Sequence, residues 1–163
     1  MEEKLENFRF KNSEEFKHYL DEAPQESWLQ IRELGAGKKH IFLPLFITEA
    51  NADLLFKNWY VADEKFIGMN GGVLCTVKIQ ALPDYPEADY ISFTGTAGVL
   101  FKSSKNAIEF DAPNSRERAI GKAFQTLGNI FGRSLNRSYK SPEGKILKIK
   151  RGFSFLEKES NNE

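Results

Sequence analysis

Alternating apolar and polar residues predict three neighbouring strands in the middle of the chain. In residues 73–82 every second residue is apolar, from Val73 through Cys75 to Ile79. Residues 90–101 repeat the alternation, with Phe93 on the apolar face. Residues 59–67 form the third expected strand. The glycine-containing segment 68–72 then predicts a hairpin between 59–67 and 73–82.

A helical period predicts three helices around these strands. Residues 12–22 form a short helix capped by Asn12 or Ser13, and a second begins at Thr48 and ends at Phe56. The third and longest is expected at 115–135. Its apolar stripe consists of Ala119, Ile120, Ala123, Phe124, Leu127, Ile130, Phe131 and Leu135.

Together with the segments that flank them, these elements predict an α+β fold. Residues 102–113 are expected to form a mobile polar loop, and Asn114 with Glu117 resembles a capping box for the long helix. Residues 40–46 are expected to form a strand that follows a glycine turn at 35–37. We expect one domain over residues 1–155, followed by a polar tail at 156–163.

The composition is that of an intracellular protein. No apolar run approaches the ~20 residues that a membrane span needs. The start of the chain lacks the basic-then-apolar order of a signal peptide. Cys75 is the single cysteine, which excludes an intramolecular disulfide. These features predict a cytoplasmic protein without a membrane anchor.

Charge is unevenly distributed along a chain whose net charge is zero. Residues 115–151 hold ten basic and two acidic side chains, whereas residues 1–30 hold four basic and eight acidic ones. A basic segment in a neutral protein favours a local site for a polyanion such as nucleic acid. The alternative is a solvated helix face followed by a lysine-rich edge strand.

The long helix combines this charge with three glycines. A polar stripe runs along it through Arg118, Lys122, Gln125, Asn129 and Arg133. Each of Gly121, Gly128 and Gly132 costs about 1 kcal/mol relative to alanine in a helix, so their presence needs a reason. Close packing of the helix on a sheet, or close approach of DNA to the helix, would supply one.

Catalytic motifs are missing from the sequence. The two histidines and Cys75 lie in separate segments, and Cys75 alternates inward with valines as a core residue does. The segment from Gly35 to Lys39 lacks the glycine spacing of a phosphate-binding P-loop and the Ser or Thr after its lysine. We therefore expect a protein that is not an enzyme and that needs no cofactor or metal.

Two stretches resemble the N-terminal annealing domain of the Rad-fifty-two family of recombination proteins and its small phage relatives. The first stretch is RELGAGKKHIFLPLFITEANADLLF, residues 32–56. The family shows an arginine, a glycine turn, a lysine, an aromatic-apolar strand and then a helix that ends in phenylalanine before a tryptophan. The matching residues here are Arg32, Gly35, Gly37, Lys39, Phe42, Phe56 and Trp59.

The second stretch begins at Gly95-Thr96-Ala97 and continues with RERAIGKAFQTLGNIFGRSL, residues 116–135. It is similar to the family helix at Ala119, Ala123, Leu127, Gly128, Asn129 and Gly132. The resemblance covers residues 28–136, about two-thirds of the chain. One departure is that the family helix carries further basic residues where this chain has Gly121 and Gln125.

The resemblance implies both a fold and a function. The fold would be a curved antiparallel β-β-β sheet with a long helix packed across it, together with a short N-terminal helix and a β-hairpin. The function would be ATP-independent binding of single-stranded DNA and annealing of complementary strands in recombination or repair. The protein would form a homo-oligomeric ring, and a host or phage single-strand-binding protein would be a compatible partner.

The resemblance also implies which residues contact DNA. They are Arg32, Lys38, Lys39 and Lys122, with Arg118 and Arg133 carrying charge that the family places elsewhere on the helix. The polar face of residues 90–101, with Ser92, Thr94 and Thr96, is expected to face solvent or a neighbouring subunit. Two other functions stay open: an RNA-binding or replication-associated module, and a small-molecule-binding α+β domain.

Overall fold

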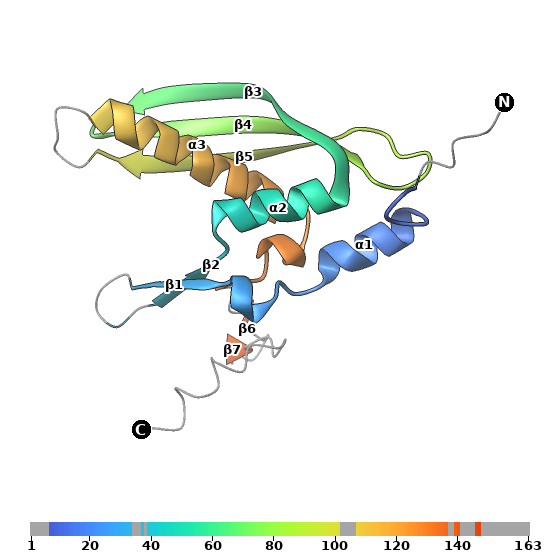
Figure 1. Cartoon of the computed structure of the whole chain (residues 1–163). Helices are drawn as coiled ribbons and strands as arrows, with labels where there is room; N and C mark the ends of the chain where they lie inside the picture. The colour runs from blue at the N-terminus through green and yellow to red at the C-terminus, as the bar shows by residue number, and fades with distance from the viewer. Residues whose placement is uncertain are drawn as a thin grey trace.

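A three-stranded antiparallel sheet with one long helix across it forms the centre of the molecule (Figure 1). The computed structural model describes residues 7–33, 37, 39–101, 107–136, 139–140 and 146–147. The strand order is β3-β4-β5, with β3 at Phe56–Met69, β4 at Gly72–Pro83 and β5 at Ile91–Leu100. Helix α3, at Ala107–Gln125, packs on β4 and β5. This arrangement confirms the expected α+β fold.

The smaller elements lie on the helix side of this unit. In Figure 1, α2 (Leu45–Leu55) lies below α3, and α1 (Ser13–Asp21) and a two-stranded hairpin lie further from the sheet. The hairpin pairs β1 (Gln30–Glu33) with β2 (Lys39–Phe42), as the fold class predicted. The rest are two 3₁₀ turns at Glu26–Trp28 and Asn129–Phe131, and a short pair of β6 (Tyr139–Lys140) with β7 (Ile146–Leu147).

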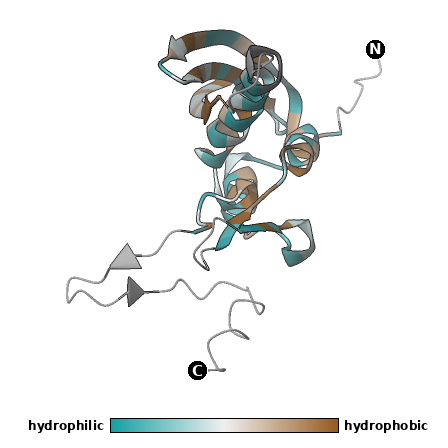
Figure 2. Ribbon diagram, turned by 90° about the vertical axis from the view of Figure 1, so that its left-hand side faces the viewer, coloured by the Kyte–Doolittle hydropathy of each residue, from teal (hydrophilic) through white to brown (hydrophobic). Residues whose placement is uncertain are grey.

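The alternation in the sequence positions the sheet on its core. Val73, Cys75, Val77 and Ile79 of β4 are all buried, as predicted, and the strands in Figure 2 alternate between hydrophobic and hydrophilic along their length. The other face of the sheet carries no helix in the described part of the chain and bears mostly polar residues. The sheet is therefore half-buried, as antiparallel sheets commonly are.

The contact between α3 and β5 is a backbone contact. A Cβ atom on Gly95 would lie 2.1 Å from the carbonyl oxygen of Ala119 and 2.2 Å from the amide nitrogen of Ala123. Only glycine on the strand and small residues on the helix permit this approach. Beside it, the buried ring of Phe124 contacts Trp59, Phe93 and Phe131 at centroid distances of 5.1, 5.3 and 5.0 Å.

The N-terminal helix is capped as predicted. The Asn12 side chain accepts hydrogen bonds from the amides of Glu14 and Glu15, at 3.1 and 2.9 Å, which selects Asn12 over Ser13 as the cap. Phe16 and Leu20 on the inner face are buried.

The bounds predicted for the long helix were wrong at both ends. Residues 107–113, expected in a loop, are helical through Pro113, and the capping box at Asn114 does not form. Ser115, expected in the first turn of the helix, is instead fully buried in its interior, and its hydroxyl donates to the Ala112 carbonyl (2.7 Å). At the other end the helix stops at Gln125, and Gly128, three residues later, is extended and packs against Leu20 of α1.

The start of α2 also differs from the prediction. The helix begins at Leu45 after Pro44, so residues 43–46 do not extend the preceding strand, which ends at Phe42. Thr48 is not the cap, since it is buried one turn into the helix and its hydroxyl donates to the Pro44 carbonyl (3.3 Å). An interior threonine can bond to the carbonyl four residues back, so its presence alone does not mark a helix start.

Each glycine of the predicted helix has its own structural setting. A Cβ on Gly128 would lie 2.2 Å from the Leu20 carbonyl oxygen, and Gly132 adopts a left-handed conformation (φ +81°) that ends the 3₁₀ turn. Gly121 is the one of the three inside α3, and nothing lies within 4 Å of its Cβ position. Tight packing therefore explains Gly128 but not Gly121.

Two glycine-to-alanine substitutions should shift stability in opposite directions. Gly95→Ala forces a Cβ into the backbone of α3 and should lower the free energy of unfolding by about 1–3 kcal/mol or more. Gly121→Ala adds a Cβ in open space within a helix and should raise it by up to about 1 kcal/mol. Urea denaturation of both variants and the parent measures the difference. Equal midpoints for the two variants would contradict the packing described here.

Candidate nucleic-acid interface

A groove runs between the outer edge of β5 and the adjacent flank of α3. Its volume is about 610 Å³. Two of the residues that line it are cationic, and none of them is acidic. The lining residues are Thr94, Gly95, Thr96, Lys122, Gln125, Thr126 and Arg133. A groove with fixed positive charge and polar walls is suited to an anionic, extended ligand.

The two cations of the groove are held by local hydrogen bonds. Lys122 is exposed on α3, and its ammonium donates to the side-chain oxygen of Gln125 at 3.1 Å. Arg133 comes from the turn after the helix, and its guanidinium donates to the main-chain carbonyl of Thr126. Carbonyls at the end of a helix carry partial negative charge, which favours a cation there. Both side chains keep donors for a ligand.

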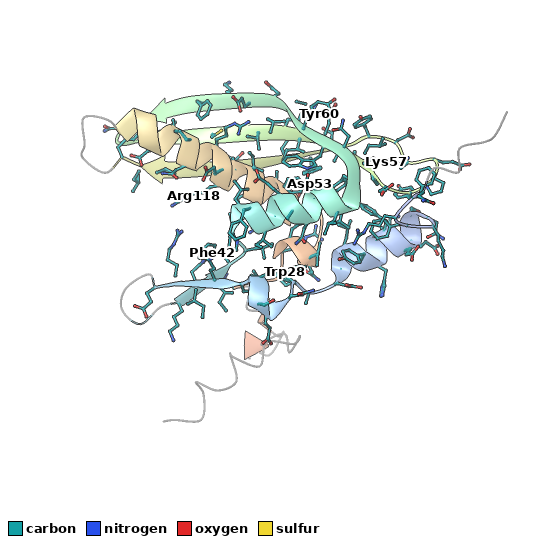
Figure 3. The ribbon with its side chains drawn as sticks, in the orientation of Figure 1. Trp28, Phe42, Asp53, Lys57, Tyr60 and Arg118 are labelled. Carbon is teal, nitrogen blue, oxygen red and sulfur yellow. The ribbon has the colours of Figure 1, made fainter. Side chains whose placement is uncertain are left out.

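Arg118 extends the basic side of α3 beyond the groove. It lies four residues before Lys122, so the two side chains are neighbours on one flank of the helix. In Figure 3, Arg118 is on the side of α3 toward the hairpin that carries Phe42. It is exposed but does not line the groove.

The hairpin carries the predicted residues Arg32 and Lys39. Arg32 is exposed, and its guanidinium lies over the ring of Phe42, 4.9 Å from the centroid. Lys39 is exposed opposite Glu33 in the strand register. Lys38, also predicted, lies outside the described residues, as do the limits of the expected domain and tail.

A short segment after α3 connects the hairpin to the groove. The side-chain amide of Asn136 bonds to both main-chain groups of Ile41 in β2, accepting from the amide nitrogen (2.9 Å) and donating to the carbonyl. Arg133 lies three residues before Asn136. The structure therefore places Lys122 and Arg133 in one groove, and the segment that carries Arg133 is bonded three residues later to the hairpin of Arg32 and Lys39.

Sequence reasoning missed some of these residues. Gln125 was placed on the polar stripe of the helix but was not predicted as a site residue, yet it lines the groove and accepts from Lys122. Thr94 and Thr96 are exposed, and their side chains lie on the polar sheet face as expected, but the strand edge at these two residues also lines the groove, which was not predicted. Nothing in the local pattern signals Asn136, because its partner Ile41 is 95 residues away in sequence.

The opposite flank of α3 is acidic and paired. Arg116 bonds to Glu64 of β3 at 2.6 Å, so this cation is already matched by an acid. Asp53 of α2 accepts from the Trp59 indole at 2.7 Å. Burial, reinforced by the charges of Asp53 and Glu117, raises the pKa of Glu49 above its ordinary value of 4.5, and Arg116 lowers it in part. The β5 flank of α3 therefore carries the groove cations, whereas the α2 flank gathers acids.

The described residues hold neither a metal site nor an exposed thiol. No group of three His, Cys, Asp or Glu side chains among them is placed to bind a metal ion. Cys75 is fully buried, as predicted, and burial raises the pKa of its thiol, which keeps it protonated near neutral pH. No helix in this part of the chain is long and apolar enough to cross a membrane.

Comparison with known proteins does not assign this chain to a family. A scan against protein-family models finds no match, and a search of curated proteins finds none either. The function must therefore be argued from the groove and its surroundings.

The Glu49 carboxyl should make stability depend on pH. Its pKa is raised in the folded state, so the folded state loses stability relative to the unfolded chain as pH rises through and above 4.5. Glu49→Gln removes this cost and should raise the melting temperature near neutral pH, with the gain disappearing below about pH 4. Asp89→Asn, at an exposed loop carboxylate, is the control. A gain for Glu49→Gln that does not change with pH would contradict this explanation.

Proposed function

We propose that this protein binds single-stranded DNA and anneals complementary strands without ATP, in recombination or repair. The observation that supports this most directly is the groove that joins Lys122 and Arg133 to an acid-free wall of β5. The resemblance of residues 28–136 to an annealing domain favours DNA as the polyanion. The β-β-β-α order of the fold is the one this resemblance implies.

The chemistry of the site favours contacts to phosphates over contacts to bases. Lys122 is a compact point charge, whereas Arg32 and Arg133 present planar guanidinium groups that can bind two phosphate oxygens. The rings of the described site lie beneath or behind these cations: Phe42 lies under Arg32 and Phe124 is buried. A strand bound through its phosphates keeps its base edges available to a complementary strand, which is what annealing requires.

The charge difference between the flanks of α3 would orient the strand. DNA following the basic flank passes Arg118, Lys122 and Arg133, and the anchor of Asn136 on β2 leads it toward Arg32 and Lys39. On the other flank Glu49, Asp53 and Glu117 repel phosphate. We propose this route as the DNA path, and a homo-oligomeric ring would repeat it from subunit to subunit.

Neutralising the groove cations should weaken DNA binding in a salt-dependent way. Lys122→Gln and Arg133→Gln should each lower affinity for an oligonucleotide and reduce the slope of log affinity against log salt by about 0.7. Arg32→Gln should do the same if the hairpin contacts DNA. Fluorescence anisotropy over a salt series measures both quantities.

Lys78→Gln is the matched control for these variants. Lys78 is exposed on β4, outside the groove, so its loss should change neither affinity nor slope beyond a general charge effect. Melting temperatures of all four variants exclude unfolding as the cause. If Lys122→Gln and Arg133→Gln bind like the control, the groove is not the DNA site.

Annealing itself is tested with two complementary labelled oligonucleotides in the absence of ATP. The protein should accelerate pairing over the spontaneous rate at low and moderate salt, and light scattering should show a particle larger than 18.6 kDa. Binding without acceleration would leave a nucleic-acid-binding module and remove annealing. Tighter binding to RNA of the same sequence would favour an RNA-binding module instead.

A further inference from the structure

Among the residues that the structure describes, the outer edge of β5 lacks the protection that strand edges usually carry. The strand contains no charged residue and no proline, and its register with β4 is unbroken from Ile91 to Leu100. The sheet's other edge strand, β3, is interrupted by two register shifts and carries three consecutive charged residues, 63–65. Bulges and edge charges prevent unwanted strand pairing, and β5 has neither.

The hydrogen-bond alternation shows which groups of β5 face outward. The amide of Phe101 donates to the Gly71 carbonyl at 2.8 Å, which continues the β4–β5 register by one residue. In an antiparallel pair every second residue bonds to its partner, and the residues between point the other way. Ser92, Thr94 and Thr96 therefore direct both their N–H and C=O groups away from β4. The 3.0 Å contact of the Thr76 and Thr96 hydroxyls fits this non-bonded position.

These outward backbone groups belong to the groove. Thr94 and Thr96 line it, whereas their side chains lie on the sheet face opposite α3, so the strand edge is what they present to Lys122 and Arg133. The edge offers donors and acceptors in alternation. A phosphate backbone can accept from the N–H groups but cannot donate to the C=O groups. An extended peptide satisfies both.

We propose that the edge of β5 from Ser92 to Gly98 is a docking site for an extended acidic segment of a partner protein. The segment adds to the sheet as a fourth strand, and alternate acidic side chains on its α3 side reach Lys122 and Arg133. It occupies the same groove as nucleic acid and competes with it. The competition rests on the proposed function, whereas the docking does not.

Charge and face alternation identify the occupant. A strand added here places every second side chain over the cations and the others beside Ser92, Thr94 and Thr96, where small or β-branched residues fit. The β3 strand of a second copy fits less well, because its adjacent acids Asp63 and Glu64 point to opposite faces. Glu64 is also already bonded to Arg116. An alternating acidic peptide matches the groove better than another copy of the chain.

The experiment uses a labelled peptide of alternating glutamate and threonine, of about eight residues, the length of an ordinary strand. Two further peptides carry N-methyl groups on one or the other set of alternate amides, with the charge unchanged. Strand addition predicts that one of the two loses affinity by about tenfold or more and that the other keeps it, since only one set of amides faces β5. Fluorescence anisotropy with the full chain measures all three.

Two protein variants and one control variant make the test independent of the peptide chemistry. Thr96→Pro removes an outward amide without removing a bond to β4, and should weaken the peptide about tenfold. Lys122→Glu should weaken it through charge, while Lys78→Glu, outside the groove, should not. Melting temperatures report whether Thr96→Pro folds. If it does not, the two methylated peptides still decide the question.

Three results would overturn the proposal. The first is equal affinity of both methylated peptides, and the second is no binding of the unmethylated peptide. The third is that the chain binds no peptide but assembles with itself, and that Thr96→Pro abolishes this assembly. The last result would assign the edge to a second copy. If the peptide binds as expected and labelled single-stranded DNA does not, the docking site holds and the proposed function fails. If both bind, unlabelled DNA should displace the peptide, and failure to do so would remove the competition.

Discussion

The backbone contact between α3 and β5 at Gly95 is the constraint on which the rest of the molecule depends. With no Cβ on the strand and only alanines on the helix, the two backbones approach to a distance that no larger residue allows. This contact sets the helix directly over β4 and β5 and brings Phe124 into the aromatic cluster. It also brings Lys122 beside the edge of β5, so the packing that stabilises the fold creates the groove. A methyl group at Gly95 would displace the helix and change both the packing of the core and the groove.

The placement of α3 divides the protein electrostatically. The flank toward α2 and β3 gathers acids, and its cation Arg116 is matched by Glu64. The flank toward β5 has cations whose hydrogen bonds go to neutral groups, an amide oxygen for Lys122 and a main-chain carbonyl for Arg133. A chain of zero net charge thus presents positive charge along one flank of a helix. Attraction of a polyanion to one side of a neutral protein follows from this separation and needs no overall charge.

The two edges of the sheet also differ: the edge on the acidic side is protected against strand pairing, and the edge on the basic side is not. The edge of β3 is charged and bulged, which resists pairing, whereas the regular, uncharged edge of β5 is not covered by any described strand and lies beside the cations. Positive charge and unpaired backbone groups therefore coincide in one groove. In the two proposals, nucleic acid would use the first property and a peptide strand would use both. A single site that either ligand can occupy would couple DNA binding to a protein partner through simple exclusion.

Local periodicity determined a large part of this structure. The alternation in 73–82 and 90–101 correctly predicted the strands and their buried faces, Asn12 was a valid cap, and the apolar stripe of Ala119 to Phe124 was a valid packing face. The end of α3 and the membership of the groove were decided only by the tertiary structure. Beyond the end of α3, the Gly128 backbone packs closely against Leu20, and Arg133 lies in a turn that is followed by Asn136, which bonds to β2. These contacts join segments about a hundred residues apart in the sequence. They are made to individual backbone groups and do not recur along a helix or strand, so no periodicity in the sequence predicts them.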